Sequence, residues 1–214
     1  MVYIIGIGIE GKSSLSQRAL KLIEGAGMLI GGRRHLVSFP AFKGRKIVIG
    51  SNLEDIAKIL NRKSKIGNRR YPVVLATGDP NFFGIADFLI KRLGKDSVAI
   101  IPNVSAMQEA FARIKENWNG ARFFSLHGRD RGQGSGVGGQ ENMIDSTVHK
   151  IIHYDKVGLF TDPDNTPSKI AKTLLNNGAK DYVAYVCEDL GTDKEKVTQG
   201  ALAMIARKSF SPLN

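Results

Sequence analysis

Residues 2–30 read VYIIGIGIEGKSSLSQRALKLIEGAGMLI and alternate between two kinds of pattern. Residues 2–5 and 28–30 are short apolar runs typical of buried strands, whereas residues 15–24 have the apolar spacing of an amphipathic helix. A glycine-rich loop joins the first run to the helix. Strand, helix and strand in this order predict a βαβ unit, in which the two strands lie parallel in one sheet.

The same alternation continues through the first half of the chain. Further candidate strands are residues 46–49, 72–76 and 98–101, and further candidate helices are residues 53–60 and 86–93. A helix over residues 105–114 closes this half. The series predicts a mainly parallel sheet that is covered by helices.

A second, shorter series follows, with strands at 121–125, 157–160 and 182–187 and a helix at 166–177. This helix has clear end signals, because Thr166 suits the N-cap, Pro167 suits the first turn and Gly178 follows the end. We therefore expect an α/β protein with two α/β domains, residues 1–115 and 116–214. Residues 129–140, RDRGQGSGVGGQ, are rich in glycine and predict a mobile loop.

Composition limits the class of protein. The chain has 214 residues, of which 42% are hydrophobic, as expected of a globular protein. Its single cysteine, Cys187, excludes an intramolecular disulfide and favours a reducing compartment. The N-terminus lacks the features of a signal peptide, and no apolar run reaches the ~20 residues of a membrane span. We expect a cytoplasmic protein without a membrane partner. The net charge of +11 attracts polyanions but does not say which.

The loop GIGIEGKS at residues 6–13 fits two phosphate-binding patterns. Its three glycines match the G-x-G-x-x-G of dinucleotide sites, and the whole segment matches the G-x-x-x-x-G-K-[ST] of P-loops. Neither match has its usual context, because no acid ends the second predicted strand and Asp79 is a poor counterpart of the magnesium-binding aspartate of a P-loop NTPase. On the loop alone, a tight strand-to-helix turn that binds no ligand stays equally open.

Seven short segments form a series along the chain. They are GIGIEG at 6–11, IGGRRHL at 30–36, LATGDPNFFG at 75–84, IPNVSAMQ at 101–108, SLHGR at 125–129, TDPDNTP at 161–167 and VCEDLG at 186–191. In this order they resemble the tetrapyrrole methylase family, with its G-x-G-P-G, S-G-D-P-x-x-[FY]-G and I-P-G-[IV]-S-S-x-Q motifs. The segments are most similar to its carbon-5 branch, the cobalt-precorrin-7 or precorrin-6Y methyltransferases. Any one match is weak, whereas seven in register over most of the chain are specific.

Some features depart from the family pattern. Ile9 and Glu10 stand where the family usually has Pro-Gly, and Asn103 replaces a glycine. Asparagine tolerates left-handed backbone better than most residues, so we expect the turn at Asn103 to be kept. The chain ends about where a final family strand would begin, so we expect the second domain to lack that strand. The decarboxylating second domain of some relatives is not expected here, and a separate carbon-15 methyltransferase is therefore a candidate partner.

The resemblance implies a fold, a cofactor and an activity. Family members have two α/β domains with S-adenosylmethionine in the cleft between them, and many are homodimers; we expect the same here. The implied activity is methylation of carbon 5 of cobalt-precorrin-7 or precorrin-6Y in cobalamin biosynthesis. The implied cofactor contacts occupy the matching loop positions of this chain: Ile9, Gly78, Asp79, Phe82, Ser105, Ala106, Thr161, Leu190 and Gly191.

The implied substrate is a small tetrapyrrole with many carboxylates, which suits the positive charge of the chain. Guanidinium groups match carboxylates geometrically. Methyl transfer from a sulfonium is an in-line displacement that needs no metal, so we expect catalysis mainly from near-attack positioning, and no general base is assigned. The candidate substrate contacts are Gly8, Arg33, Arg34, His35, His127 and Arg129.

Other functions stay as alternatives. The same fold serves methylases of uroporphyrinogen, of a diphthamide precursor and of ribosomal RNA, and the segments IGGRRHL and SLHGR favour the carbon-5 branch over these. A P-loop NTPase or kinase that uses Lys12 and Ser13 is a rival of another class. A basic RNA-binding module is a third, but the chain lacks a recognisable base-stacking motif, so no nucleic-acid partner is expected.

Overall fold

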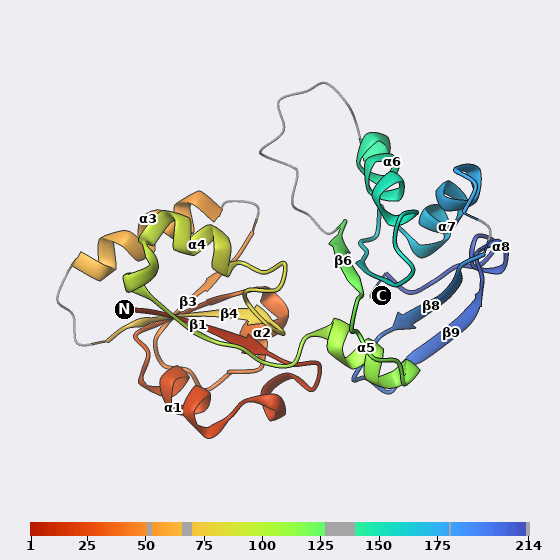
Figure 1. The fold of residues 1–214 in the computed structure, drawn as a ribbon. Coiled ribbons are helices and arrows are strands. Elements are labelled where there is room, and N and C mark those ends of the chain that lie inside the picture. Colours follow the sequence, from red (N-terminus) through yellow and green to blue (C-terminus); the bar gives the residue numbers. More distant parts are fainter. Residues whose placement is uncertain (51–52, 66–69, 127–139, 180, 213–214) are drawn as a thin grey trace. The chain divides into compact units, whose positions relative to one another are not determined.

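The computed structural model describes residues 1–50, 53–65, 70–126, 140–179 and 181–212. The chain divides into two compact units, Met1–Ala106 and Met107–Asn214, and we describe each by itself (Figure 1). The boundary falls at the start of helix α5 (Ala106–Ile114), ahead of residue 115, where the sequence pattern places the domain boundary. The expected pair of domains with a cleft between them stays a prediction.

Five parallel strands form the sheet of the first unit, as far as the structure describes that unit. They are β1 (Val2–Ile7), β2 (Met28–Gly31), β3 (Arg45–Val48), β4 (Pro72–Thr77) and β5 (Val98–Ile101), in the spatial order β3-β2-β4-β1-β5. β1 pairs with both β4 and β5, so that Tyr3 lies opposite Val73 on one side and Ala99 on the other. The predicted strands and the mainly parallel sheet are confirmed, with small shifts at the strand ends.

Helices cover both faces of this sheet (Figure 1). Successive side chains of a strand point to opposite faces, so neighbouring strand residues join different cores. Ile5 and Val73 pack with the buried side of α1 (Gln17–Gly25). Ile4 and Val74 pack with buried residues of α3 (Leu53–Lys65) and α4 (Ala86–Leu93). Burial on both faces explains why the strands read as continuous apolar runs.

Two helical features of the first unit differ from the sequence prediction. α1 begins later than predicted, because the Ser16 hydroxyl accepts the N–H of Ala19 at 3.2 Å and makes Ser16 the N-cap. A short 3₁₀ helix, η1 (Gly11–Ser14), precedes this cap, and another, η2 (Lys95–Ser97), precedes β5. Helix α2 (Arg33–Val37) was not predicted, because five residues are too few to show a helical period.

Where the structure describes the second unit, it contains two small sheets. β6 (Arg122–Ser125) and β7 (Val157–Phe160) pair in parallel, whereas β8 (Val183–Glu188) and β9 (Lys196–Ala201) form an antiparallel pair. Its further helices are α6 (Gln140–Ile151), α7 (Pro167–Asn176) and α8 (Leu202–Ile205). The expected end signals of α7 are confirmed: the Thr166 hydroxyl caps the helix, Pro167 begins it, and Gly178 follows with a φ of +84°.

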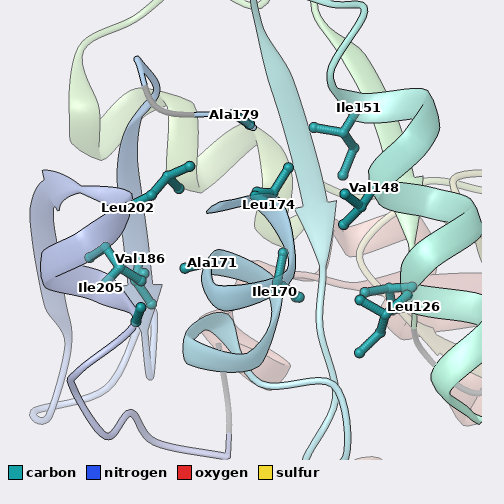
Figure 2. Packing of buried hydrophobic residues seen from close by; sticks show 12 residues of the cluster. Leu126, Val148, Ile151, Ile170, Ala171, Leu174, Ala179, Val186, Leu202 and Ile205 are labelled. Atoms are coloured by element: carbon teal, nitrogen blue, oxygen red, sulfur yellow. The ribbon is translucent and has the colours of Figure 1, made fainter. Parts of the chain in front are cut away.

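The core of the second unit joins these helices to β8. Val148 of α6, Ile170 and Leu174 of α7, Val186 of β8 and Ile205 of α8 are buried in one cluster (Figure 2). α6, β9 and α8 were not predicted. The predicted mobile loop at 129–140 falls almost wholly outside the described residues, and its last residue begins α6. No helix that the structure describes is both long and apolar enough to cross a membrane.

Candidate functional site

The carboxyl ends of the parallel strands bring the predicted ligand loops of the first unit to one edge. Because the strands run in the same direction, the loops that follow β1, β2, β4 and β5 all leave this edge. β1 lies between β4 and β5, so the loops that begin at Gly8, Gly78 and Pro102 are neighbours. Open parallel α/β sheets usually bind their ligands at this edge.

The backbones of these three loops meet directly at two glycines. The N–H of Gly78 donates to the carbonyl of Ile7 at 2.6 Å, and the N–H of Asn103 donates to the carbonyl of Gly78 at 3.3 Å. A Cβ on Gly6 would lie 1.8 Å from the Gly78 oxygen, and one on Gly78 would lie 2.7 Å from the Cα of Ser105. Gly78 also has a φ of +59°, which glycine adopts at little cost. Side chains at these two positions would therefore separate the loops.

The side chain of Asn103 holds the first loop in place. Its Nδ2 donates to the carbonyl of Gly6 at 3.2 Å and to the carbonyl of Ser14 at 3.0 Å. The Ser14 hydroxyl in turn accepts the N–H of Gly8 at 2.9 Å. Asn103 thus keeps the turn, but not by a left-handed backbone, because its φ is not among the positive ones. Half-buried Ile9 follows Gly8 in this fixed loop, and a ligand contact from either residue stays a prediction.

The first loop differs from a P-loop in where its helix begins. Residues 11–14 form η1, and α1 starts only after a further cap residue, whereas in a P-loop the helix follows the Gly-Lys-Ser/Thr sequence directly. The hydroxyl of Ser13 donates to the carbonyl of Glu10 at 2.8 Å. The Lys12 ammonium lies 5.7 Å from the centre of the Phe39 ring. Both side chains make contacts within the chain, which disfavours the P-loop interpretation.

The loop after β4 presents a carboxylate and an aromatic pair. One oxygen of half-buried Asp79 accepts the N–H of Asn81 at 2.9 Å, the Asx turn that an aspartate before proline favours. Its other oxygen makes no hydrogen bond with the described residues. The rings of Phe82 and Phe83 lie 5.0 Å apart, and Phe83 has a φ of +52°, an uncommon conformation for a bulky residue. Asp79 therefore shapes the loop, and a ligand contact from its other oxygen stays a prediction.

Ser105 and Ala106 stand where the loop after β5 enters α5. The side chain of Ser105 is buried, and Ala106 is the first residue of the helix. The first N–H groups of a helix have no partner within it. This helix end can bind polar or anionic groups of a ligand.

A polar cluster stands at the ends of β2 and β4. Arg33 and Arg34 are exposed, whereas His35 is half-buried. Burial, followed by the neighbouring charge of Arg34, lowers the pKa of His35 to about 4. The imidazole is therefore neutral near physiological pH and supplies no charge for an anion. Its Nε2 lies 3.3 Å from the hydroxyl of Thr77, the last residue of β4.

The remaining predicted contacts belong to the second unit or lie outside the described residues. Half-buried Thr161 directly follows β7. Leu190 and Gly191 lie in the turn between β8 and β9, where the N–H of Gly191 donates to Oε2 of Glu195 at 2.8 Å. His127 and Arg129 lie outside the described residues.

The Glu195 carboxylate that holds this turn is itself held by helix α5. Arg113 Nε donates to Oε1 of Glu195 at 2.6 Å, and Arg113 Nη1 donates to Glu109 at 2.7 Å. These contacts lower the pKa of Glu195, chiefly through the hydrogen bond from Arg113 and then through that from Gly191.

Sequence reasoning missed three residues of these loops: Thr77, Asn103 and Glu195. Thr77 is the residue before the Gly78-Asp79 motif, and its position at a strand end beside a candidate loop was the available signal. Asn103 was noticed only as a departure from a glycine. Glu195 lies in no family segment, and its role depends on an arginine far away in the sequence.

Comparison with known proteins places the whole chain in one group. A family model of tetrapyrrole (corrin/porphyrin) methylases matches residues 1–206. The chain is 32% identical over 199 residues to the cobalt-precorrin-7 C(5)-methyltransferase of Salmonella typhimurium, covering 92% of this chain and 89% of that protein. It is also 32% identical over 215 residues to the probable cobalt-precorrin-7 C(5)-methyltransferase of Methanocaldococcus jannaschii, covering 100% of this chain and 95% of that protein.

A solved structure has the same fold. The uroporphyrin-III C-methyl transferase of Thermus thermophilus, crystallised with S-adenyl homocysteine, matches with a TM-score of 0.65 at 21% identity and covers 99% of this chain and 88% of that one. The fold, the motif order and the sequence matches agree. This chain belongs to the tetrapyrrole (corrin/porphyrin) methylase family.

Proposed function

We propose that this chain transfers a methyl group from S-adenosylmethionine to carbon 5 of a corrin precursor, cobalt-precorrin-7 or precorrin-6Y. The observation that carries the proposal is the 32% identity to proteins named for this reaction, which extends over 92% of this chain in one case and all of it in the other. Of the two segments most similar to the carbon-5 branch, residues 30–36 run from the carboxyl end of β2 into α2, at the edge where open parallel sheets bind ligands.

The loops at the carboxyl edge of the first unit fit S-adenosylmethionine. Gly6 and Gly78 let the backbones of the three loops touch, which brings the candidate contacts Ile9, Asp79 and Ser105 to one edge of the sheet. The unpaired oxygen of Asp79 suits the cofactor's ammonium or ribose hydroxyl groups, and the start of α5, at Ser105 and Ala106, suits its carboxylate. Ile9 and Phe82 would supply apolar contact. From the second unit, Thr161, Leu190 and Gly191 are the proposed contacts.

The catalytic contribution of the chain is positioning. When bound, S-adenosylmethionine supplies a methyl group activated by its sulfonium. The rigid junction at Gly6, Gly78 and Asn103 holds the surrounding loops still, which keeps the reacting atoms in near-attack geometry. Arg33 and Arg34 on α2 are placed at the same edge, where their charges favour carboxylates of the substrate.

The first test is binding of S-adenosylhomocysteine, followed by turnover. We expect calorimetry to show binding at micromolar affinity or better without added metal. Incubation with S-adenosylmethionine and cobalt-precorrin-7 should then add one methyl group, measured by mass spectrometry, whereas uroporphyrinogen III should stay unchanged. Methylation of uroporphyrinogen III instead would overturn the substrate, and absence of binding of both cofactor forms would overturn the activity.

A further inference from the structure

Three polar side chains meet at the carboxyl end of β4, one residue before the proposed cofactor loop. Thr77 ends the strand and is exposed. α2 follows the neighbouring strand β2 and brings two side chains to it: Nε2 of His35 lies 3.3 Å from Oγ1 of Thr77, and Nη2 of Arg34 donates to the same oxygen at 3.5 Å. Two nitrogen groups therefore converge on one hydroxyl.

The tautomer of His35 follows from its surroundings. The imidazole is neutral near physiological pH, since burial and the charge of Arg34 lower its pKa to about 4, so it carries one N–H. Nδ1 is buried and has no hydrogen-bond partner among the described residues. A proton on Nδ1 would be a buried, unpaired donor, whereas a proton on Nε2 can be donated to Thr77. Unpaired buried N–H groups are rarer in proteins than unpaired acceptors, which favours the proton on Nε2.

With the proton on Nε2 of His35, the Thr77 hydroxyl accepts two hydrogen bonds and still has its own proton to donate. A hydroxyl oxygen has two lone pairs and one proton. His35 and Arg34 donate to the oxygen, so the proton is directed away from both of them. Because Thr77 is exposed, the acceptor is solvent or a ligand. An O–H donor beside an exposed guanidinium matches the two oxygens of a carboxylate, since charge-assisted hydrogen bonds are the strong ones.

We propose that Thr77 binds a carboxylate of the substrate through its hydroxyl proton, with Arg34 supplying the charge and His35 acting as a positioning residue that orients the hydroxyl. This inference rests on the proposed function, because it takes the substrate to be a polycarboxylate corrin that occupies the carboxyl edge of the sheet. It changes the role of His35 from an anion contact to a donor that acts through Thr77.

Two variants of Thr77 test the hydroxyl. Thr77→Val keeps the shape and removes the O–H, whereas Thr77→Ser keeps the O–H. A hydrogen bond to a charged group corresponds to about a tenfold to hundredfold change in affinity. We expect Thr77→Val to raise the KM for cobalt-precorrin-7 by that factor, Thr77→Ser to stay within about threefold of wild type, and S-adenosylhomocysteine binding to be unchanged in both. Equal KM values in Thr77→Val and wild type would overturn the inference.

The chain offers a matched control for this pair. The hydroxyl of Thr173 donates to the carbonyl of Lys169 within α7 at 3.1 Å, so Thr173→Val removes a threonine hydroxyl bonded only to backbone. It should leave the KM for the corrin unchanged. A rise in KM equal to that of Thr77→Val would show a general effect of the substitution and count against a substrate contact.

The role of His35 is tested by rescue and by spectroscopy. His35→Gln keeps an N–H within reach of Thr77, and His35→Leu removes it. We expect the KM to rise in His35→Leu and to recover in His35→Gln, with thermal stability measured for both. The imidazole ¹⁵N shifts of the wild type should report a neutral ring protonated on Nε2. A neutral ring protonated on Nδ1 would overturn the positioning role.

Direct binding separates this inference from the proposed function. Cobyrinic acid is a stable corrin polycarboxylate, and its binding by absorbance titration needs no turnover. If wild type methylates no corrin precursor but Thr77→Val weakens cobyrinic acid binding about tenfold or more, the carboxylate site stands and the proposed reaction falls. If wild type methylates cobalt-precorrin-7 and Thr77→Val binds cobyrinic acid as wild type does, the proposed reaction stands and the inference falls. A wild type that neither binds nor methylates a corrin overturns both.

Discussion

At Gly78 the backbone conformation and the available space both require glycine. Its φ is +59°, and a Cβ there would lie 2.7 Å from the Cα of Ser105, a backbone atom that cannot move aside freely. Gly178 has a φ of +84° at the left-handed end of α7, where the N–H of Ala179 donates to the carbonyl of Leu174, but a Cβ added there would meet no described atom within 4 Å, so Gly178 carries the conformational requirement alone. Substituting alanine at each of these two glycines therefore separates the backbone strain from the steric overlap.

We expect Gly78→Ala to lower the free energy of unfolding by more than Gly178→Ala does. Each substitution carries a left-handed strain of about 1–2 kcal/mol, and Gly78→Ala adds the overlap with Ser105. Gly78→Ala should also abolish S-adenosylhomocysteine binding, because it pushes the loops after β4 and β5 apart. Urea unfolding and calorimetry measure the two effects. Equal unfolding energies in the two variants would show that the overlap is relieved by a small shift.

Lys12 decides between the P-loop and the methylase interpretations. A P-loop lysine contacts the terminal phosphates, so its removal would abolish nucleotide binding. In this structure Lys12 lies in η1 and its ammonium stands over the Phe39 ring. Helix α1 begins only at Gln17, so Lys12 does not lie at its N-terminus.

We expect the wild type to show no magnesium-dependent ATP binding in equilibrium dialysis. Lys12→Ala should bind S-adenosylhomocysteine as wild type does, and its unfolding energy should fall by about 0.5–1 kcal/mol through loss of the cation–π contact. Saturable ATP binding that disappears in Lys12→Ala would overturn the proposed function.

At the scale of elements, the pattern of apolar residues was sufficient for the sheet of the first unit. β5 and α4 were predicted with the bounds that the structure has, because their apolar runs are bounded by glycine or polar residues. β9 was missed because its sequence, KVTQGA, buries only Thr198 well and shows no apolar alternation. Periodic patterns reveal elements that bury a face, and they do not reveal short or mostly exposed ones.

The candidate site was predictable only in part, for a related reason. The family resemblance grouped Gly78, Asp79 and Ser105 as cofactor contacts, and the strand order of the structure brings their loops to one edge. The Asn103 side chain, by contrast, donates hydrogen bonds to Gly6 and Ser14, which are 97 and 89 positions away in the sequence. Local patterns carry no information on such distant hydrogen bonds, so the contacts that hold the loops became visible only in the structure.

The Arg113–Glu195 ion pair joins two elements of the second unit. Arg113 belongs to α5, and Glu195 precedes β9 and accepts the N–H of Gly191 in the turn that is proposed to contact the cofactor. Asp189 and Gly191 in this turn have φ values of +50° and +78°, so its conformation depends on being held. The pair is therefore expected to position the turn.

We expect Glu195→Gln to weaken S-adenosylhomocysteine binding and to make the thiol of Cys187 react faster with iodoacetamide. Burial first and then the charge of Glu195 raise the pKa of Cys187, while Arg113 lowers it. Removing the negative charge thus lowers that pKa and increases the thiolate fraction. Arg113→Ala should slow the same reaction.

Asp87→Asn is the matched control, because the exposed Asp87–Lys91 pair lies within α4 of the first unit. It should change neither the alkylation rate nor cofactor binding. Unchanged cofactor affinity in both Glu195→Gln and Arg113→Ala would mean that the turn keeps its conformation without the pair.

At the scale of the whole molecule, the net charge of +11 matches a substrate with many carboxylates. Such a charge raises the rate of encounter with a polyanion and does so less as salt screens it. A general attraction would depend little on which cation is removed, whereas a contact depends on its position. Arg33 and Arg62 are both exposed arginines of the first unit, but Arg33 follows the carboxyl end of β2 and Arg62 lies in α3.

Arg33→Ala and Arg62→Ala therefore remove the same charge from different places, which lets salt dependence distinguish contact from attraction. We expect Arg33→Ala to raise the KM for cobalt-precorrin-7 by about twofold to fivefold at low salt, the range of an exposed ion pair. The difference from wild type should shrink at physiological ionic strength, where the screening length is about 8 Å.

S-adenosylhomocysteine affinity, measured by calorimetry at both salt concentrations, should stay unchanged in both variants, because the cofactor carries no excess of negative charge. Arg62→Ala should change the KM little at either salt concentration. Equal increases in the two variants would assign the effect to net charge alone and remove Arg33 from the proposed substrate contacts.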